Sequence, residues 1–260
     1  MNHHGAFRGK RVIITGAAGI YGGWIAAAFA AEGAVLCLTD GRRDKLDGVA
    51  ASLGLDPAVT LLEGCDLADA AEIARFAERI KARWGAPDVL VNNAGVYPRT
   101  GVLIEPTDAE FDRIMAVNVR APFVMVKHIS RLMVAERVEG AIVNIGSGAA
   151  RQMPTGSVTY CMSKTALERL SKGQALELAP YRIRVNVVEP GFAPGSDFSY
   201  LPPEYVERMT GRIPLGRNSL PDDAAQMVLY LCSPSAAYVT GAVVGVDGGN
   251  SIGTFQPTNS

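Results

Sequence analysis

A hydroxyl, a phenol and an ammonium occur together in the segment SGAARQMPTGSVTYCMSK, residues 147–164. Tyr160 and Lys164 are four residues apart, so in a helix their side chains lie close together on one face. A neighbouring positive charge favours the phenolate, and we therefore expect Lys164 to lower the pKa of Tyr160 from about 10 toward working pH. Ser147 precedes a predicted turn and can hydrogen-bond a substrate oxygen. The segment predicts proton transfer, although the same spacing also arises where a tyrosine packs over a lysine stem whose ammonium lies in water.

Glycines follow the first predicted strand directly. The strand RVIIT (11–15) leads into TGAAGIYGGW, where Gly16, Gly19, Gly22 and Gly23 enter a predicted helix. Glycine lets the backbone turn tightly and approach a pyrophosphate, whose charge is stabilised at a helix N-terminus. A tight strand-to-helix turn also needs glycine for steric reasons alone. The strand before and the helix after the cluster favour a dinucleotide site.

Asp40 lies at the carboxyl end of the second predicted strand, about where an acid binds the adenosine ribose after such a turn. A carboxylate accepts hydrogen bonds from both ribose hydroxyls and repels a 2′-phosphate, so Asp40 favours NAD over NADP. The alternative is that Asp40 has a purely structural role as a helix cap. Arg42 and Arg43 can contact the 2′-phosphate of NADP, or simply begin the next helix in solvent. The sequence therefore predicts NAD and leaves NADP possible.

An alternation of short apolar strands and amphipathic helices must position these residues. Strands are predicted at 11–15, 34–39, 58–64, 88–92, 141–145, 183–189 and 242–246, and helices at 19–32, 42–53, 68–84, 107–117, 121–138, 157–179 and 221–232. Because the strands are apolar on both faces, they predict an α/β fold, a single doubly wound Rossmann-type domain over residues 1–260. We expect a mostly parallel sheet of about seven strands with helices on both faces. The segment 192–220 is too long for an ordinary connection and is typical of a substrate lid.

Composition excludes several classes of protein. Apolar residues make up 48% and charged residues 20% of the chain, as in ordinary globular proteins. A net charge of −1 provides no basic field for nucleic acid. The start, MNHHGAFRGKRVIITG, lacks the apolar core of a signal peptide, and no run is long enough to span a membrane. We therefore expect a cytoplasmic protein with neither a nucleic-acid nor a membrane partner.

Cysteine and histidine are scattered along the chain. The cysteines are irregularly spaced and form no CxxC motif, so we expect reduced thiols that serve as small apolar residues. Cysteine and histidine together form no cluster of metal-ligand spacing, and we expect no metal. The residues concerned are Cys37, Cys65, Cys161, Cys232, His3, His4 and His128.

Further motifs accompany the glycine turn in a fixed order. They are CDL at 65–67, NNAG at 92–95, VNV at 117–119, YCMSK at 160–164, PG at 190–191 and VDGG at 246–249. Over residues 7–252 the chain resembles the short-chain dehydrogenase/reductase family. The resemblance implies the candidate catalytic residues Asn118, Ser147, Tyr160 and Lys164. It implies the candidate cofactor-binding residues Gly16, Gly19, Ile20, Tyr21, Gly22, Asp40, Asp66, Leu67, Asn93, Ala94, Gly95, Tyr160, Lys164, Pro190, Gly191 and Ala193.

The resemblance also implies individual roles. Asp66 and Leu67 would border the adenine, and the backbone at 190–193 would meet the nicotinamide. Ser147 would bind the reacting oxygen. Lys164 would hold the nicotinamide ribose, and Asn118 would organise a water linking Lys164 to solvent. From the residues alone, Asn118 is equally a turn or cap residue and Asp66 an N-cap.

Two positions depart from the family pattern. Ile20 stands where members usually have glycine, and isoleucine does not easily adopt positive φ. We expect either a turn re-registered around Gly19 or an altered cofactor affinity. Gly195 stands where a threonine often helps to hold the carboxamide.

The substrate pocket is expected to combine residues from three segments. An arginine there can bind an acid or be a solvated surface charge, and the mixture also suits a partly polar ring compound. The expected lining is Val96, Tyr97, Arg99, Arg151, Gln152, Met153, Phe192, Tyr200 and Tyr205.

The sequence thus predicts an NAD-dependent oxidoreductase that interconverts a secondary alcohol and a ketone. Two alternatives stay open: an NADPH-dependent 3-oxoacyl thioester reductase, and a non-catalytic regulatory protein that binds the cofactor. The resemblance further implies a homo-oligomer, a tetramer or dimer, packed through the helices near 107–137 and 157–179.

Overall fold

The computed structural model describes residues 5–97, 102–195 and 201–255, which contain one seven-stranded sheet. Its strand order is β3-β2-β1-β4-β5-β6-β7, and every adjacent pair is parallel. The predicted α/β fold is confirmed, and the sheet is parallel throughout rather than mostly. The strands are β1 (Arg11–Thr15), β2 (Val35–Asp40), β3 (Leu61–Gly64), β4 (Val89–Asn92), β5 (Ala141–Ile145), β6 (Arg184–Pro190) and β7 (Val243–Val246).

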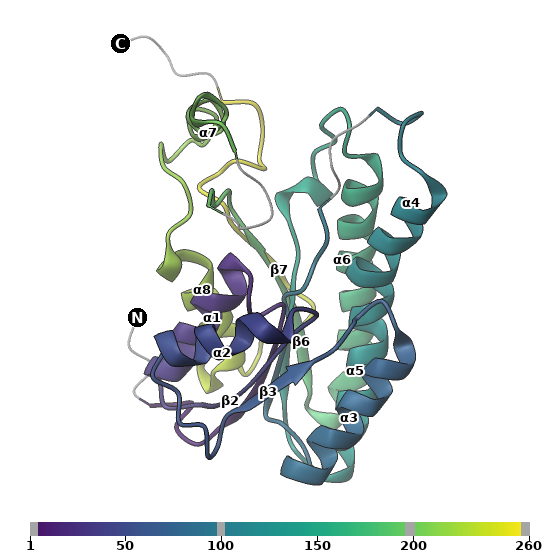
Figure 1. The fold of residues 1–260 in the computed structure, drawn as a ribbon, viewed down its shortest axis with the longest axis vertical. Coiled ribbons are helices and arrows are strands. Elements are labelled where there is room, and N and C mark those ends of the chain that lie inside the picture. Colours follow the sequence, from purple (N-terminus) through teal and green to yellow (C-terminus); the bar gives the residue numbers. More distant parts are fainter. Residues whose placement is uncertain (1–4, 98–101, 196–200, 256–260) are drawn as a thin grey trace.

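Helices cover both faces of this sheet (Figure 1). One face carries α1 and α8, which pack against each other, and the other carries α3, α5 and α6. Such an arrangement explains why the strands are apolar on both sides. The helices are α1 (Ile20–Ala31), α2 (Arg43–Ser52), α3 (Ala70–Trp84), α4 (Asp108–Met115), α5 (Ala121–Ala135), α6 (Val158–Leu178), α7 (Pro203–Thr210) and α8 (Pro221–Cys232).

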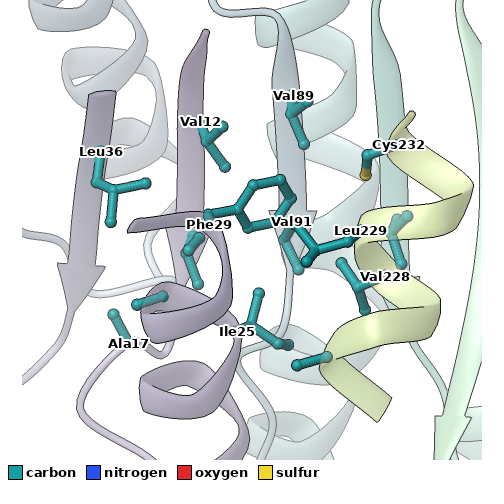
Figure 2. Close-up of a cluster of buried hydrophobic side chains, with 14 of the residues drawn as sticks. Val12, Ala17, Ile25, Phe29, Leu36, Val89, Val91, Val228, Leu229 and Cys232 are labelled. Atoms are coloured by element: carbon teal, nitrogen blue, oxygen red, sulfur yellow. The ribbon is translucent and has the colours of Figure 1, made fainter. Parts of the chain in front are cut away.

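Alternate side chains of β1 are buried in two separate hydrophobic cores, one on each face of the sheet. Val12 faces the cluster that includes Phe29 of α1 and Leu229 of α8, shown in Figure 2. Ile13 points to the opposite face and joins the cluster that includes Phe76 of α3. Because side chains alternate along a strand, one short apolar strand fixes helices on both sides of the sheet.

The ends of α3 follow from local chemistry. Asp69 is its N-cap, and the side chain accepts a hydrogen bond from the Ala71 amide at 2.7 Å. Gly85, with φ of +72°, ends the helix. The alternative assignment of Asp66 as an N-cap is therefore wrong by three positions.

Two other elements differ from the sequence prediction. The segment 192–220, expected to be irregular, contains α7, which begins at Pro203, a residue suited to the first helical turn. Between α4 and α5 the chain forms a π-helical turn, Ala116–Arg120, where a break between two α-helices was expected. The assignment of 192–220 to a lid stays a prediction. No helix in the described ranges has the length and apolar character needed to cross a membrane.

Candidate active site

The carboxyl ends of the parallel strands meet at one edge of the sheet. Thr15, Asp40 and Asn92 end β1, β2 and β4, and Ile145 and Pro190 end β5 and β6. In open α/β sheets this edge is where ligands bind. The residues singled out in the sequence follow these strand ends.

The glycine turn after β1 brings backbone segments close together. Gly16 has φ of +63°, and a Cβ added there would lie 2.7 Å from the Ala94 Cα. A Cβ on Gly22 would lie 2.1 Å from the Gly16 carbonyl oxygen. Both positions therefore require glycine for the turn to close.

Ile20 causes no strain in this turn. Gly19 is the N-cap of α1, with φ of −87°, and Ile20 is the first residue of the helix. Among the described residues, positive φ outside glycine occurs only at Arg137 and Arg182. Gly19 has no side chain to cap the helix, and the first turn contains no acidic residue. The amides of that turn are thus left for an anion.

The Asp40 carboxylate is anchored over this turn. Its Oδ2 accepts a hydrogen bond from the Ala18 amide at 3.1 Å, and its Oδ1 accepts one from the Arg42 amide at 3.0 Å. The Arg42 Nε lies 3.4 Å from the same Oδ1, and Arg43 pairs with Asp47 at 2.8 Å. The N-cap position of α2 is Arg42, so the alternative of Asp40 as that helix's N-cap is wrong.

Asn93 joins the loop after β4 to the glycine turn. Its Nδ2 donates to the carbonyls of Thr15 at 2.9 Å and Gly16 at 3.0 Å. The Thr15 hydroxyl accepts from the amides of Asn93 and Ala94, both at 3.0 Å. Gly95 follows, where an added Cβ would lie 3.6 Å from the Lys164 Nζ. The loop therefore runs between the glycine turn and the start of α6.

Asn118 lies buried in the π-helical turn and binds the same loop. Its Oδ1 accepts from the Val96 amide at 2.8 Å, and its Nδ2 donates to the Val96 carbonyl at 3.0 Å. The Nδ2 also donates to the Ser163 hydroxyl at 3.0 Å. Asn118 thus couples this loop to α6, a link through Ser163 that the sequence did not suggest. Its expected role in organising a water stays a prediction.

Lys164 is buried behind the tyrosine. Its Nζ donates to the Ile145 carbonyl at 2.9 Å and lies 5.8 Å from the centroid of the Tyr160 ring. Burial lowers the pKa of the Lys164 ammonium to about 8. The charged form of Lys164 is therefore less favoured than that of an exposed lysine.

The side chains of Tyr160 and Ser147 interact. Burial raises the pKa of Tyr160 to about 12, and a hydrogen bond with the Ser147 side chain acts in the opposite direction. The expectation that Lys164 brings this pKa down toward neutrality is therefore wrong for the protein chain by itself. The physical reason is that burial dominates, while the ammonium lies beside the ring and donates to Ile145.

Aromatic rings border the Tyr160 phenol and the segment after β6. Tyr97, 58% exposed, packs edge-on against Tyr160 with ring centroids 4.7 Å apart. Phe192 packs edge-on against Tyr205 at 6.4 Å. Two other residues of the expected pocket, Arg99 and Tyr200, lie outside the described residues.

Arg151 is paired with a buried carboxylate. Its guanidinium donates to Glu189 of β6, whose side chain is fully buried, while the Arg151 side chain is 42% exposed. The expectation that Arg151 is a simple solvated charge is therefore wrong, and the expectation that it binds an acidic substrate stays a prediction. Glu189 was missed, although a charged residue inside the apolar run IRVNVVE was a signal for it.

The remaining expected cofactor residues follow β3 and β6. Asp66 is exposed, and its Oδ1 accepts from the Ala68 amide at 2.9 Å, while Leu67 is partly buried against the core that contains Phe76. Gly191 lies against the VDGG motif, since an added Cβ would be 3.0 Å from the Asp247 Cα. Pro190 and Ala193 flank it along the same segment. In the described ranges no group of three or more His, Cys, Asp or Glu side chains is arranged to hold a metal.

Sequence comparisons place the chain among known oxidoreductases. A family model described as enoyl-(acyl carrier protein) reductase matches residues 16–251. The 3-oxoacyl-[acyl-carrier-protein] reductase FabG of Thermotoga maritima is 36% identical, with 93% of this chain and 97% of the relative covered. The galactitol 2-dehydrogenase (L-tagatose-forming) of Cereibacter sphaeroides is 37% identical, with 97% and 100% covered.

Solved structures share the fold over almost the whole chain. The 3-ketoacyl-(acyl-carrier-protein) reductase from Brucella melitensis, complexed with NADH, has a TM-score of 0.84 at 31% identity, with 94% of this chain and 99% of that chain covered. RhlG from Pseudomonas aeruginosa, in an NADP active-site complex, has a TM-score of 0.88 at 27% identity, with 96% and 100% covered. These neighbours include both forms of the nicotinamide cofactor.

Proposed function

We propose that this chain, which belongs to the short-chain dehydrogenase/reductase family, is an NAD-dependent enzyme that interconverts a secondary alcohol and a ketone. The observation that carries the proposal is the cluster of Ser147, Tyr160 and Lys164 at the carboxyl edge of the sheet. The Ser147 side chain interacts with Tyr160, and the Lys164 ammonium lies 5.8 Å from the ring centroid. A hydroxyl that binds the reacting oxygen and a phenol that transfers a proton suit this reaction.

The residues present fit a dinucleotide. The Gly16 and Gly22 turn admits no Cβ, and the uncapped N-terminus of α1 suits a pyrophosphate. When bound, a nicotinamide ring supplies the hydride acceptor or donor.

Asp40 supports NAD as the cofactor. Its carboxylate, 11% exposed, is held above the turn and would repel a 2′-phosphate. Arg42 already interacts with Asp40, and Arg43 pairs with Asp47. Neither arginine is poised as a dedicated phosphate site.

Tyr160 would carry the proton in both directions of the reaction. In reduction, its protonated hydroxyl donates to the ketone oxygen, and a pKa of about 12 keeps that proton in place at working pH. In oxidation, its phenolate must accept the alcohol proton, and nearby positive charge is needed to offset burial. Lys164 supplies such a charge below its own pKa of about 8. Ser147 orients the substrate oxygen toward the phenol.

A neutral hydroxylated compound is the favoured substrate class. Because Glu189 neutralises Arg151, this arginine offers no free charge to an acidic substrate. A polyol dehydrogenase is among the similar proteins. The second candidate is an NADPH-dependent 3-oxoacyl thioester reductase, which the 36% identity to FabG supports. The regulatory alternative would bind cofactor without turnover.

We also propose that the protein is a homo-oligomer in the cytoplasm. Phe123 of α5 is half exposed and borders a hollow of about 760 Å³ that is lined from α4, α5 and α6. Burial of this apolar surface by a second copy would explain its exposure. All four cysteines are free and buried, which supports a reducing compartment.

Turnover assays with secondary alcohols and ketones, each with NAD and NADP, test this proposal. Tyr160→Phe should lower kcat by about 100-fold or more while binding of NAD is nearly unchanged, because only the proton carrier is removed. Tyr181→Phe, at an exposed position, is the control. Substantial activity in Tyr160→Phe would refute the assignment. Preference for NADPH and 3-oxoacyl thioesters would favour the second candidate, and binding without any turnover would favour the regulatory one.

A further inference from the structure

Tyr21 connects the glycine turn to the segment that follows β6. It is the second residue of α1, and its hydroxyl donates a hydrogen bond to the Gly191 carbonyl at 2.8 Å. Trp24 packs edge-on against its ring, with centroids 5.2 Å apart. The bond therefore joins two halves of the expected cofactor site that are 170 residues apart in the sequence.

A third segment meets the same phenol. The Ser219 side chain interacts with the Tyr21 hydroxyl, although its buried Oγ lacks a hydrogen bond of standard geometry within the described part of the chain. The Ser219 amide donates to the Phe192 carbonyl at 2.8 Å. Tyr21 thus lies where the glycine turn, the segment after β6 and the approach to α8 come together.

The phenol is a permanent donor at this junction. Burial raises the pKa of Tyr21 to about 12, so the hydroxyl keeps its proton throughout the working range. A carbonyl accepts and cannot donate, so the direction of the bond with Gly191 is fixed.

The segment that receives this bond borders open space on one side. Gly191 and Phe192 border a cavity of about 480 Å³, which also contacts Ser219. A few residues on, Gly195 has φ of +102° and would meet nothing within 4 Å if it carried a Cβ. Gly191 itself packs against Asp247, and beyond that contact the bonds from the Tyr21 hydroxyl and the Ser219 amide decide where this backbone lies.

We propose that Tyr21 is a positioning residue whose hydroxyl fixes the position of the backbone at 190–193 relative to the glycine turn. This inference rests on the proposed function, because the segment 190–193 is where the nicotinamide half of the cofactor is expected. Tyr21 then acts on that half alone, and the adenosine half, expected at Asp40 and Asp66, is independent of it.

Tyr21→Phe keeps the ring and its contact with Trp24 but removes the donor. Calorimetric titration should show the Kd for NAD rising about tenfold, the expected effect of one lost hydrogen bond. The Kd for ADP-ribose, which lacks the nicotinamide, should be unchanged. Tyr181→Phe, at an exposed position, should alter neither value.

Hydrogen exchange in the ligand-free protein tests the restraint without any cofactor. The amides of residues 191–193 should exchange faster in Tyr21→Phe, while those of β5 keep their rates. Equal loss of NAD and ADP-ribose affinity would overturn the inference, because Tyr21 would then only shape the glycine turn. Unchanged NAD affinity or unchanged exchange would also overturn it. A wild-type protein that binds neither ligand would refute the proposed function, and the exchange rates would still decide the role of Tyr21.

Discussion

At the scale of single residues, burial moves the two central titratable groups in opposite directions. The pKa of Lys164 falls to about 8 because its ammonium is desolvated, and the pKa of Tyr160 rises to about 12 because its phenolate is desolvated. Both groups are therefore biased toward their neutral forms. The same shifts make the stability of the fold depend on pH.

Lys164 should make folding more favourable as pH rises from about 8 to 10.5. Below that window the lysine is charged in both states, and the folded state is destabilised by the free-energy cost of burying the charge. Within it the folded lysine is neutral while the unfolded one, with its ordinary pKa of 10.5, still binds a proton. Because the unfolded state binds more protons there, the free energy of unfolding rises with pH, by about 3 kcal/mol across the window.

Urea unfolding at several pH values would measure this effect as the difference between wild type and Lys164→Met. The difference should grow in favour of the wild type between pH 8 and 10, and groups common to both proteins cancel. Lys172→Met, at an exposed position of the same helix, should give a flat difference. A flat difference for Lys164→Met as well would show that this ammonium is not desolvated in the fold.

At the scale of elements, one ion pair connects the loop after β5 to strand β6. Arg151 follows the short 3-10 turn Gly148–Ala150, and Glu189 is the penultimate residue of β6. The carboxylate is fully buried, and its Oε1 has no hydrogen-bond partner among the described residues. Removing the arginine would leave an uncompensated charge in the core.

Arg151→Met should lower the free energy of unfolding by about 3 kcal/mol, because a buried charge loses its partner. The double variant Arg151→Met/Glu189→Gln should recover most of that loss, since the remaining group is neutral. Urea denaturation would measure both. Arg182→Met removes an exposed pair with Glu139 and should change stability by less than about 1 kcal/mol. A similarly small effect in Arg151→Met would contradict the buried-pair interpretation.

At the scale of the whole molecule, the fold buries all four thiols, three of them in the two cores on either side of the sheet. Cys37, Cys65, Cys161 and Cys232 are buried and free. Burial raises the pKa of each thiol, that of Cys65 to about 11 and that of Cys232 to about 12. Since the thiolate is the reactive species, these side chains should be inert while the protein is folded.

Labelling with a thiol-specific disulfide reagent at neutral pH should therefore be slow in the native protein and complete, at four thiols, in urea. A dinucleotide that binds only the folded state should slow native labelling further. Glutathione under the same conditions gives the rate for an exposed thiol. Rapid labelling of even one cysteine in the native state would place that thiol at the surface.

Most of the fold was predictable from the sequence because its signals are local. The predicted β1, β5 and α8 match the observed residues, since each is a short apolar run or a capped amphipathic segment with clear ends. The π-helical turn at Asn118 and helix α7 were not predictable. The first depends on the amide of Asn118 pairing with Val96 from a distant loop, and the second lies within a segment rich in proline.

The sequence by itself determined which chemical groups this protein carries and the order in which they follow the strands. Parallel strands end at one edge, so a hydroxyl, a phenol and an ammonium placed after β5 had to lie near the glycine turn after β1. Only the tertiary structure decided the electrostatics and the long-range contacts. The pKa of Tyr160, the partner of Arg151 and the bond from Tyr21 to Gly191 depend on burial and on segments far apart in the chain, which no local pattern encodes.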